Sequence, residues 1–218
     1  MIFGLLPLLV LGGIIWAVVG MLRKGTGEAL TLATATAFYA NLMILAGILA
    51  TLIGVGDAVK AALGAVNVGY SYYVYNGPQP PCPGPVEKCG GGGPPLGYLD
   101  QQRSQDAVLA ITLVVIGVAV VIGHHFLFKA IRAMKGGSPV WIIRGRWIAL
   151  TGICGLIGLG SAAFATYTTI SFFILSGPAS KQPFGESLGI ALAFLPAWAF
   201  AVSRLLREVR SGSGEAAA

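Results

Sequence analysis

Charged residues are scarce in this sequence. Lys, Arg, Asp and Glu make up 10% of the 218 residues and hydrophobic residues make up 56%, whereas soluble proteins carry charge on roughly a quarter of their residues. Fourteen basic and eight acidic side chains are too few to cover the surface of a water-soluble domain of this length. The composition therefore excludes a soluble globule and a disordered chain. It also excludes a nucleic-acid-binding domain, although the net charge is +6.

Residues that support common enzyme chemistry are also few. The chain has three cysteines and two histidines. It lacks a CxxC pair, the GxSxG and HExxH motifs and a phosphate-binding loop with its lysine. We therefore expect neither a catalytic site nor a cofactor, and we lean against an enzyme.

Long uncharged runs are what the sequence does contain. A membrane-spanning helix needs about 20 mainly apolar residues, and five runs reach a comparable length: 2–22, 29–56, 107–128, 147–176 and 187–205. The runs are continuously apolar rather than alternating, which indicates helices. The sequence predicts an all-α integral membrane protein, a single membrane domain of about five transmembrane helices, with the lipid bilayer as its surroundings.

The basic residues predict an orientation. Ten of the fourteen fall on one side of the predicted spans: Arg23, Lys24, Lys129, Arg132, Lys135, Arg144, Arg146, Arg204, Arg207 and Arg210. Cytoplasmic segments carry the excess of Lys and Arg in membrane proteins. We therefore expect a plasma-membrane protein with its N-terminus outside and a cytoplasmic tail at 206–218.

The only sizeable piece of the predicted extramembrane chain is one external loop at 57–105. We expect a short interfacial helix at 58–68 and a strand-like, tyrosine-rich stretch at 69–75, followed by a Pro- and Gly-rich tract. Cys82 and Cys89 lie in that tract, and in an oxidising compartment they would pair as a disulfide. The alternative is two free thiols.

Apart from Arg204, which closes the uncharged part of the fifth, no Asp, Glu, Lys or Arg falls inside the five predicted spans. Ionisable residues at membrane depth are typical of proton relays and ion-coupled transporters. Their lack makes charge-coupled transport less favoured, although backbone carbonyls can still coordinate ions.

His124 and His125 are the weak candidates for cofactor binding. Neighbouring helical residues point about 100° apart, so the pair cannot clamp one metal from one face. A haem normally takes its two axial ligands from two helices. The simpler interpretation is a pair of interfacial histidines, and we expect no metal site.

The fourth span carries small residues at helical spacing. Thr151 and Gly155 lie on one strip, and Gly158 and Ala162 lie on the neighbouring strip with Cys154. Small residues let two helix backbones approach closely in a membrane. We interpret this surface as a helix-packing contact inside the chain, with a dimer seam as the alternative, and Cys154 as a buried apolar residue.

Two short matches suggest an internal repeat. Leu45-Ala-Gly-Ile48 resembles Leu150-Thr-Gly-Ile153, and Leu127-Phe-Lys-Ala-Ile-Arg132 resembles Leu205-Leu-Arg-Glu-Val-Arg210. They predict one helix followed by two tandem helical hairpins, spans two and three and then spans four and five.

The layout of 29–210 also resembles an uncharacterised bacterial multi-pass membrane family, catalogued as a domain of unknown function and built of repeated helix pairs. Three stretches carry the resemblance: His124-His-Phe-Leu-Phe-Lys129, Arg144-Gly-Arg-Trp147 and Arg204-Leu-Leu-Arg207. The resemblance implies the fold, and it implies no activity, ligand or site residue.

Three functions are consistent with these features. The first is a non-catalytic accessory or structural subunit of a membrane complex, with other membrane subunits or further copies of the chain as partners. The second is a channel or small-molecule transporter with a path along the fourth and fifth spans. The third is a membrane redox protein that uses His124 or His125.

Overall fold

Long helices make up almost all of the described structure. The computed structural model describes residues 32–73, 98–133, 140–175 and 182–215. They form α2 (Leu32–Val66), α3 (Val68–Ser71), α4 (Tyr98–Ala133), α5 (Val140–Ile174) and α6 (Gly185–Glu215), with no strand in these residues. The all-α fold predicted from the uncharged runs is confirmed.

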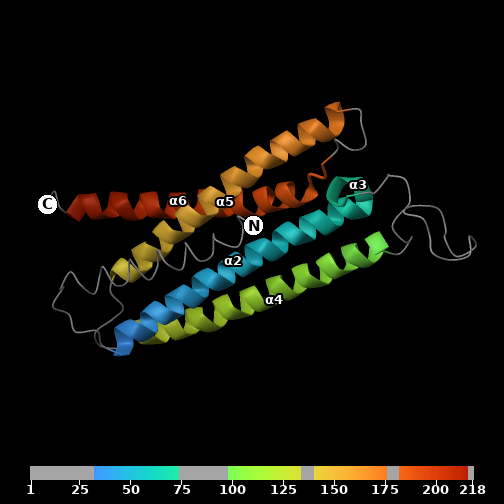
Figure 1. Cartoon of the computed structure of the whole chain (residues 1–218). Helices are drawn as coiled ribbons and strands as arrows, with labels where there is room; N and C mark the ends of the chain where they lie inside the picture. The colour runs from blue at the N-terminus through green and yellow to red at the C-terminus, as the bar shows by residue number, and fades with distance from the viewer. Residues whose placement is uncertain (1–31, 74–97, 134–139, 176–181, 216–218) are drawn as a thin grey trace, which may run out of the picture.

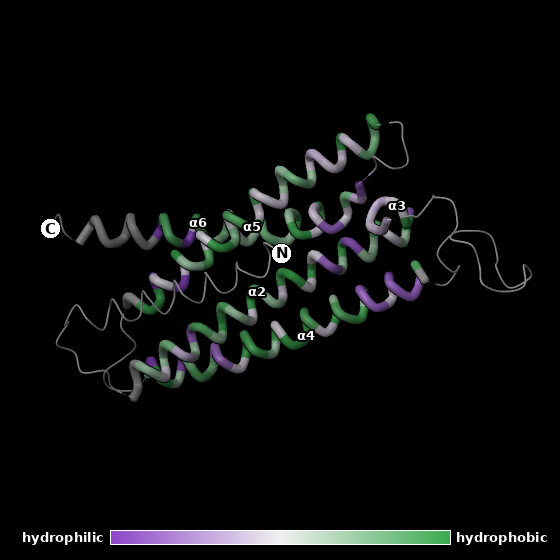
Figure 2. Tube along the Cα trace, in the orientation of Figure 1, coloured by the Kyte–Doolittle hydropathy of each residue, from purple (hydrophilic) through white to green (hydrophobic). Residues whose placement is uncertain are grey.

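Four of these helices are long and apolar enough to cross a membrane, namely α2, α4, α5 and α6. Figure 2 shows their middle sections as hydrophobic and the hydrophilic residues gathered toward their ends. The chain is a multi-pass membrane protein. The first predicted span, 2–22, lies outside the described residues.

The two predicted hairpins are both present. α2 packs along α4, and α5 packs along α6, while α2 also contacts α6 (Figure 1). The main contacts therefore run in the order α4, α2, α6, α5. This arrangement is an open row of helices within the described chain rather than a closed ring.

Two apolar clusters hold the row together. One joins α2, α4 and the start of α5 and includes Ala40, Ile44 and Phe128. The other joins α2, α5 and α6 and is centred on Leu45, Cys154 and Phe194. Complete burial of Phe194 and Cys154 places the second cluster at the crossing of the two hairpins.

Glycines allow the backbones of α2 and α4 to approach each other closely. A Cβ at Gly47 would lie 2.8 Å from the Gly117 carbonyl oxygen, and one at Gly54 would lie 2.8 Å from that of Ala110. Gly152, which matches Gly47 in the predicted repeat, meets nothing within 4 Å. The matched motifs therefore make different contacts, and the internal repeat is not visible in the packing.

The helices are longer than the uncharged runs. Helical structure extends into both ends of the predicted loop 57–105, since α2 continues to Val66 and α4 begins at Tyr98. No separate helix starts at 58, and α3, a single helical turn, replaces the first part of the predicted strand-like stretch. At the other end of the chain, α6 continues to Glu215, through most of the predicted tail. Three charged residues that close uncharged runs, Asp57, Lys129 and Arg204, lie on further turns of α2, α4 and α6.

Candidate functional site

A polar cluster lies at the end of the row where α2 ends and α3 begins, called here the α3 end. The cluster comprises Asp57, Lys60, Tyr72, Asp106 and Glu186. Its members come from α2, from α4, from the start of α6 and from the residue that follows α3. It holds two ion pairs that join different helices.

Lys60 is the centre of this polar cluster. Its ammonium nitrogen lies 3.1 Å from Oδ2 of Asp106 on α4 and 3.8 Å from Oε2 of Glu186 on α6. The Lys60 side chain is only 16% exposed. A single cation thus connects three helices, and its low exposure reduces screening of the ion pairs by water.

Tyr72 completes the contacts of Asp106. Its hydroxyl donates a 2.8 Å hydrogen bond to Asp106 Oδ2, and its ring lies 5.2 Å from the Lys60 nitrogen in a cation–π contact. Burial and, after it, the hydrogen bond and negative charge of Asp106 raise the pKa of Tyr72. The phenol therefore remains a donor at neutral pH.

α3 places Tyr72 by local hydrogen bonds. The Asn67 side chain accepts a 2.9 Å bond from the Gly69 backbone N–H and caps this helical turn. Ser71 Oγ then donates a 2.7 Å bond to the Lys60 carbonyl oxygen. The tyrosine ring packs on Gly64, where a Cβ would lie 2.6 Å from Tyr72 Cε2. These contacts fold the chain back onto α2 directly after that helix ends.

Two glycines bring α6 to the polar cluster. A side chain at Gly185 would overlap Ser71, and one at Gly189 would overlap the Gly56 carbonyl oxygen. Because Gly189 has no Cβ, the first turns of α6 lie against the α2 backbone. This close approach puts Glu186 within reach of Lys60.

Aromatic rings pack beside the polar cluster. Phe184, which is 6% exposed, lies 5.3 Å from the ring of Tyr70 and 5.5 Å from that of Phe172, and Phe173 is 6.1 Å away. These rings join α3, the end of α5 and the start of α6. The α3 end is therefore closed by both ion pairs and aromatic contacts.

The chemistry of the polar cluster favours fixing helices in place. It holds three carboxylates and one ammonium group, and Arg103 pairs separately with Asp100 at 3.3 Å. The shared lysine and the tyrosine hydroxyl are both directed at Asp106. These contacts link α2, α4, α6 and the residue that follows α3.

The predicted histidines do not converge. His124 Nδ1 donates a 2.8 Å bond to the Val120 carbonyl oxygen, and its ring meets Tyr39 edge-on at 5.6 Å. His125 is exposed and neighbours Phe126. Across the part of the chain that the structure describes, no three His, Cys, Asp or Glu residues could hold a metal ion.

Two of the small residues of α5, Gly155 and Gly158, face α6. A Cβ at Gly155 would lie 2.7 Å from Trp198 Nε1, and one at Gly158 would lie 3.2 Å from Leu195. Thr151 is half-buried, with its hydroxyl lacking a partner among the described residues. Trp198 and Leu195 thus occupy the space beside these glycines. This space lies along the fourth and fifth spans, where the channel or transporter hypothesis places its path.

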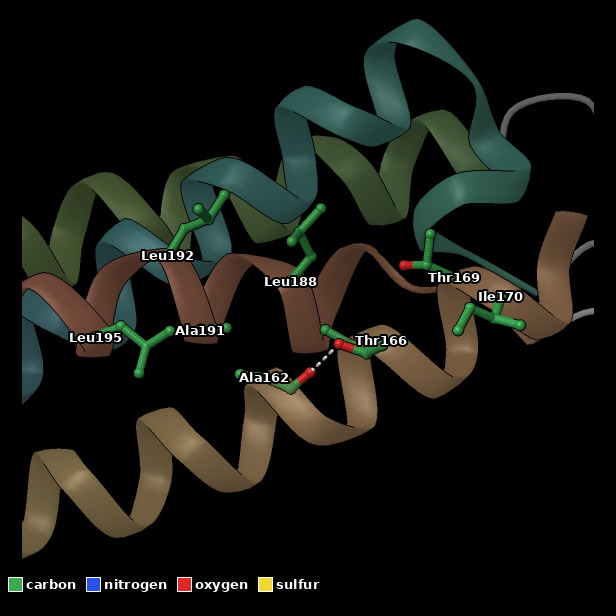
Figure 3. Close-up of a pocket in the computed structure, with 9 residues that line it drawn as sticks. Ala162, Thr166, Thr169, Ile170, Leu188, Ala191, Leu192 and Leu195 are labelled. Atoms are coloured by element: carbon green, nitrogen blue, oxygen red, sulfur yellow. Dashed lines mark hydrogen bonds between the residues drawn. The ribbon is translucent and has the colours of Figure 1, made fainter.

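Ala162 lines an apolar groove farther along α5. The groove encloses about 370 Å³ between α5 and α6 (Figure 3) and is lined by Ala162, Ala165, Thr166, Thr169, Ile170, Leu188, Ala191, Leu192 and Leu195. The Thr166 hydroxyl donates to the Ala162 carbonyl oxygen of its own helix at 2.8 Å. The groove therefore offers mainly apolar surface.

Asn41 is a buried polar residue inside the uncharged run 29–56, where the sequence analysis named no functional residue. It is 8% exposed on α2, and its Nδ2 donates a 3.1 Å bond to the Ile142 carbonyl oxygen on α5. Its amide side chain within an apolar run is the sequence signal that marks it. The predicted disulfide partners, Cys82 and Cys89, lie outside the described residues.

Comparison of the chain with protein-family models, with curated proteins and with solved structures finds no match in any of the three.

Proposed function

We propose that the chain is a non-catalytic accessory subunit that binds another membrane protein through the uncovered face of α5. The observation that carries this proposal is the environment of three α5 glycines. Among the residues that the structure describes, no atom lies within 4 Å of the Cβ positions of Gly145, Gly152 and Gly160. We call this surface the α5 glycine face.

Glycine is a costly choice at an unpacked helix position. In soluble helices it is about 1 kcal/mol less favourable than alanine, and it offers little apolar area to lipid. At Gly47, Gly54 and Gly117 the cost is offset by close helix contact. A neighbouring transmembrane helix would give the α5 glycine face the same compensation, because small residues allow backbones to approach in lipid.

The position of α5 supports this role. α5 lies at one edge of the row and packs mainly on α6, so its other side is open to a partner. Ile148, Leu156 and Leu159 flank the glycines and are between 53% and 69% exposed. A partner helix would find both a close-approach surface and apolar contacts.

The proposed orientation places the α3 end outside the cell and the basic end in the cytoplasm. The support is the positive-inside rule, since the end opposite to α3 carries Lys129, Arg132, Arg144, Arg146, Arg204 and Arg207.

Purification of the tagged full chain from its native membranes tests the proposal. We expect one partner chain in constant stoichiometry, and we expect Gly152→Leu to reduce its recovery at least tenfold, because a tenfold loss needs only about 1.4 kcal/mol. The matched control is Gly123→Leu on α4, where the glycine also has nothing within 4 Å.

Equal recovery of the partner by the two variants would contradict the proposal. Recovery of no partner, or only of further copies of this chain, would contradict it as well. Both substituted positions are open in the structure, so both variants should fold, and a monodisperse elution profile checks this.

A further inference from the structure

The exposed residues of α2 fall on a single stripe. Between residues 35 and 53, the exposed positions are Ala35, Tyr39, Leu42, Ala46 and Ile53. Their spacings of four, three, four and seven residues keep them on one face, as in a coiled-coil seam. Tyr39 is 51% exposed and Ile53 is 46% exposed. We call these five residues the α2 stripe.

Other helices occupy the remaining sides of α2. α4 covers the side of Gly47 and Gly54, and α6 meets Gly56. The start of α5 reaches Asn41. Along 35–53 the α2 stripe is thus the side of this central helix that the described neighbours leave most exposed, with Tyr39 meeting His124 of α4 at one edge.

The N-terminal uncharged run has the right length to cover this side. The α2 stripe extends over about 27 Å at 1.5 Å per residue, and the 21 residues of 2–22 would extend over about 31 Å as a helix. Asp57 follows Ile53 by one turn, so the stripe ends where the polar cluster begins.

The connection to α2 is short. The run ends at Leu22 and α2 begins at Leu32, which leaves nine residues that reach at most about 30 Å. Sequential helices with short connections are usually neighbours in space. The end of the run is therefore held near Ala35, the first residue of the stripe.

The sequence of the run complements the stripe in size. On a helix, Leu6, Val10, Gly13, Ala17 and Gly20 would share one face, because their spacings are four, three, four and three residues. In antiparallel alignment the small Gly13 and Ala17 would oppose the large Leu42 and Tyr39. The larger Val10 would oppose Ala46, and Leu6 would lie about one turn from Ile53.

We propose that the apolar segment 2–22 packs as an antiparallel helix on the α2 stripe, with Gly13 and Ala17 against Tyr39 and Leu42. The row then becomes two-layered at its centre, and the α5 glycine face stays free. This inference concerns a different helix from the proposed function and can fail without affecting it.

Disulfide cross-linking of the full chain in native membranes tests the packing. The background carries Cys82→Ser and Cys89→Ser, with the fully buried Cys154 retained. We expect Gly13→Cys with Leu42→Cys to cross-link within one chain, at least tenfold faster than Ile14→Cys with Leu42→Cys. Residue 14 is the matched control because it would lie about 100° around the helix.

Peptide mass spectrometry identifies the joined residues, and gel mobility separates monomers from dimers. A cross-link found only between chains would overturn the proposal in favour of a second copy. Equal rates for the two pairs would also overturn it. So would failure of both pairs to cross-link when a membrane-permeant maleimide still labels Leu42→Cys, because the stripe would then be accessible rather than covered by the segment 2–22.

Discussion

The two ends of the helical row hold their charges in different ways. At the α3 end, Lys60 sits among carboxylates and joins three helices. At the opposite end, cations lie over aromatic rings: Arg146 is 5.4 Å from the Trp147 ring and Arg204 is 5.3 Å from the Phe200 ring. One end is fixed by ion pairs between helices, and the other by apolar packing beneath a basic surface.

This difference follows from the distribution of acidic residues. The described α3 end carries Asp57, Asp100, Asp106 and Glu186 beside Lys60 and Arg103. At the opposite end, the charged residues whose side chains the structure describes, from Lys129 to Arg207, are basic, and Glu208 follows Arg207 on α6. Mixed charges can pair across helices, whereas like charges must face water, lipid headgroups or rings. The mixed charges of the α3 end therefore allow the ion pairs that join helices there.

The largest expected effect comes from removing the shared cation. Lys60→Met would leave Asp106 and Glu186 close together without their counter-ion, and loss of one partner from a largely buried pair costs about 3–5 kcal/mol. We expect a loss near the lower end, because Glu186 is 68% exposed. Unfolding by titration with a denaturing detergent measures the change.

Arg103→Met is the control for this prediction. Its pair with Asp100 lies within one helix, with side chains 35% and 65% exposed, so we expect a loss below about 0.5 kcal/mol. Similar losses for the two variants would show that the polar cluster does not hold the helices together.

The next largest effect on stability is expected from the substitution of a glycine at the α3 end, with a glycine at the opposite end as its control. Gly189→Ala would drive a methyl group into the Gly56 carbonyl and separate α6 from α2, with a cost of about 1–3 kcal/mol. Gly145→Ala, at the opposite end, meets open space and should be neutral or stabilising by up to about 1 kcal/mol. Destabilisation of both variants by the same amount would argue against tighter contact at the α3 end.

The smallest effect is expected at Asn41. Asn41→Leu removes one hydrogen bond to Ile142, but it also removes an Oδ1 atom that has no partner among the described residues. Replacing a half-satisfied amide by an apolar group costs little, so we expect a loss of about 1 kcal/mol or less. A loss as large as that of Lys60→Met would mean that the opposite end also depends on a polar contact.

Much of the fold could be predicted from the sequence, because the membrane requires long apolar helices. The uncharged runs located α2, α4, α5 and α6, and the order of the runs indicated their pairing. The helix ends could not be predicted, since Asp57 and Lys60 close an uncharged run without ending the helix. In α2 the helix continues for six residues beyond Lys60.

The polar cluster could not be predicted for a different reason. Lys60, Asp106 and Glu186 lie in three separate segments, and only the packed helices bring them together. The contacts of Gly155 and Gly158 could not be predicted for the same reason. Their spacing indicated a packing surface on α5, but nothing in that spacing identified Trp198 and Leu195 as the side chains that fill it. The family resemblance and the Cys82–Cys89 disulfide stay predictions.

The contrast between the ends requires them to lie on opposite sides of a bilayer. Labelling with a membrane-impermeant maleimide tests this most directly, in intact cells that carry Tyr73→Cys or Ala133→Cys together with Cys82→Ser and Cys89→Ser. Both positions are exposed, one at each end. We predict that residue 73 is labelled in intact cells and that residue 133 is labelled only after the membrane is opened. Labelling of both residues from outside, or the reverse pattern, would contradict the account.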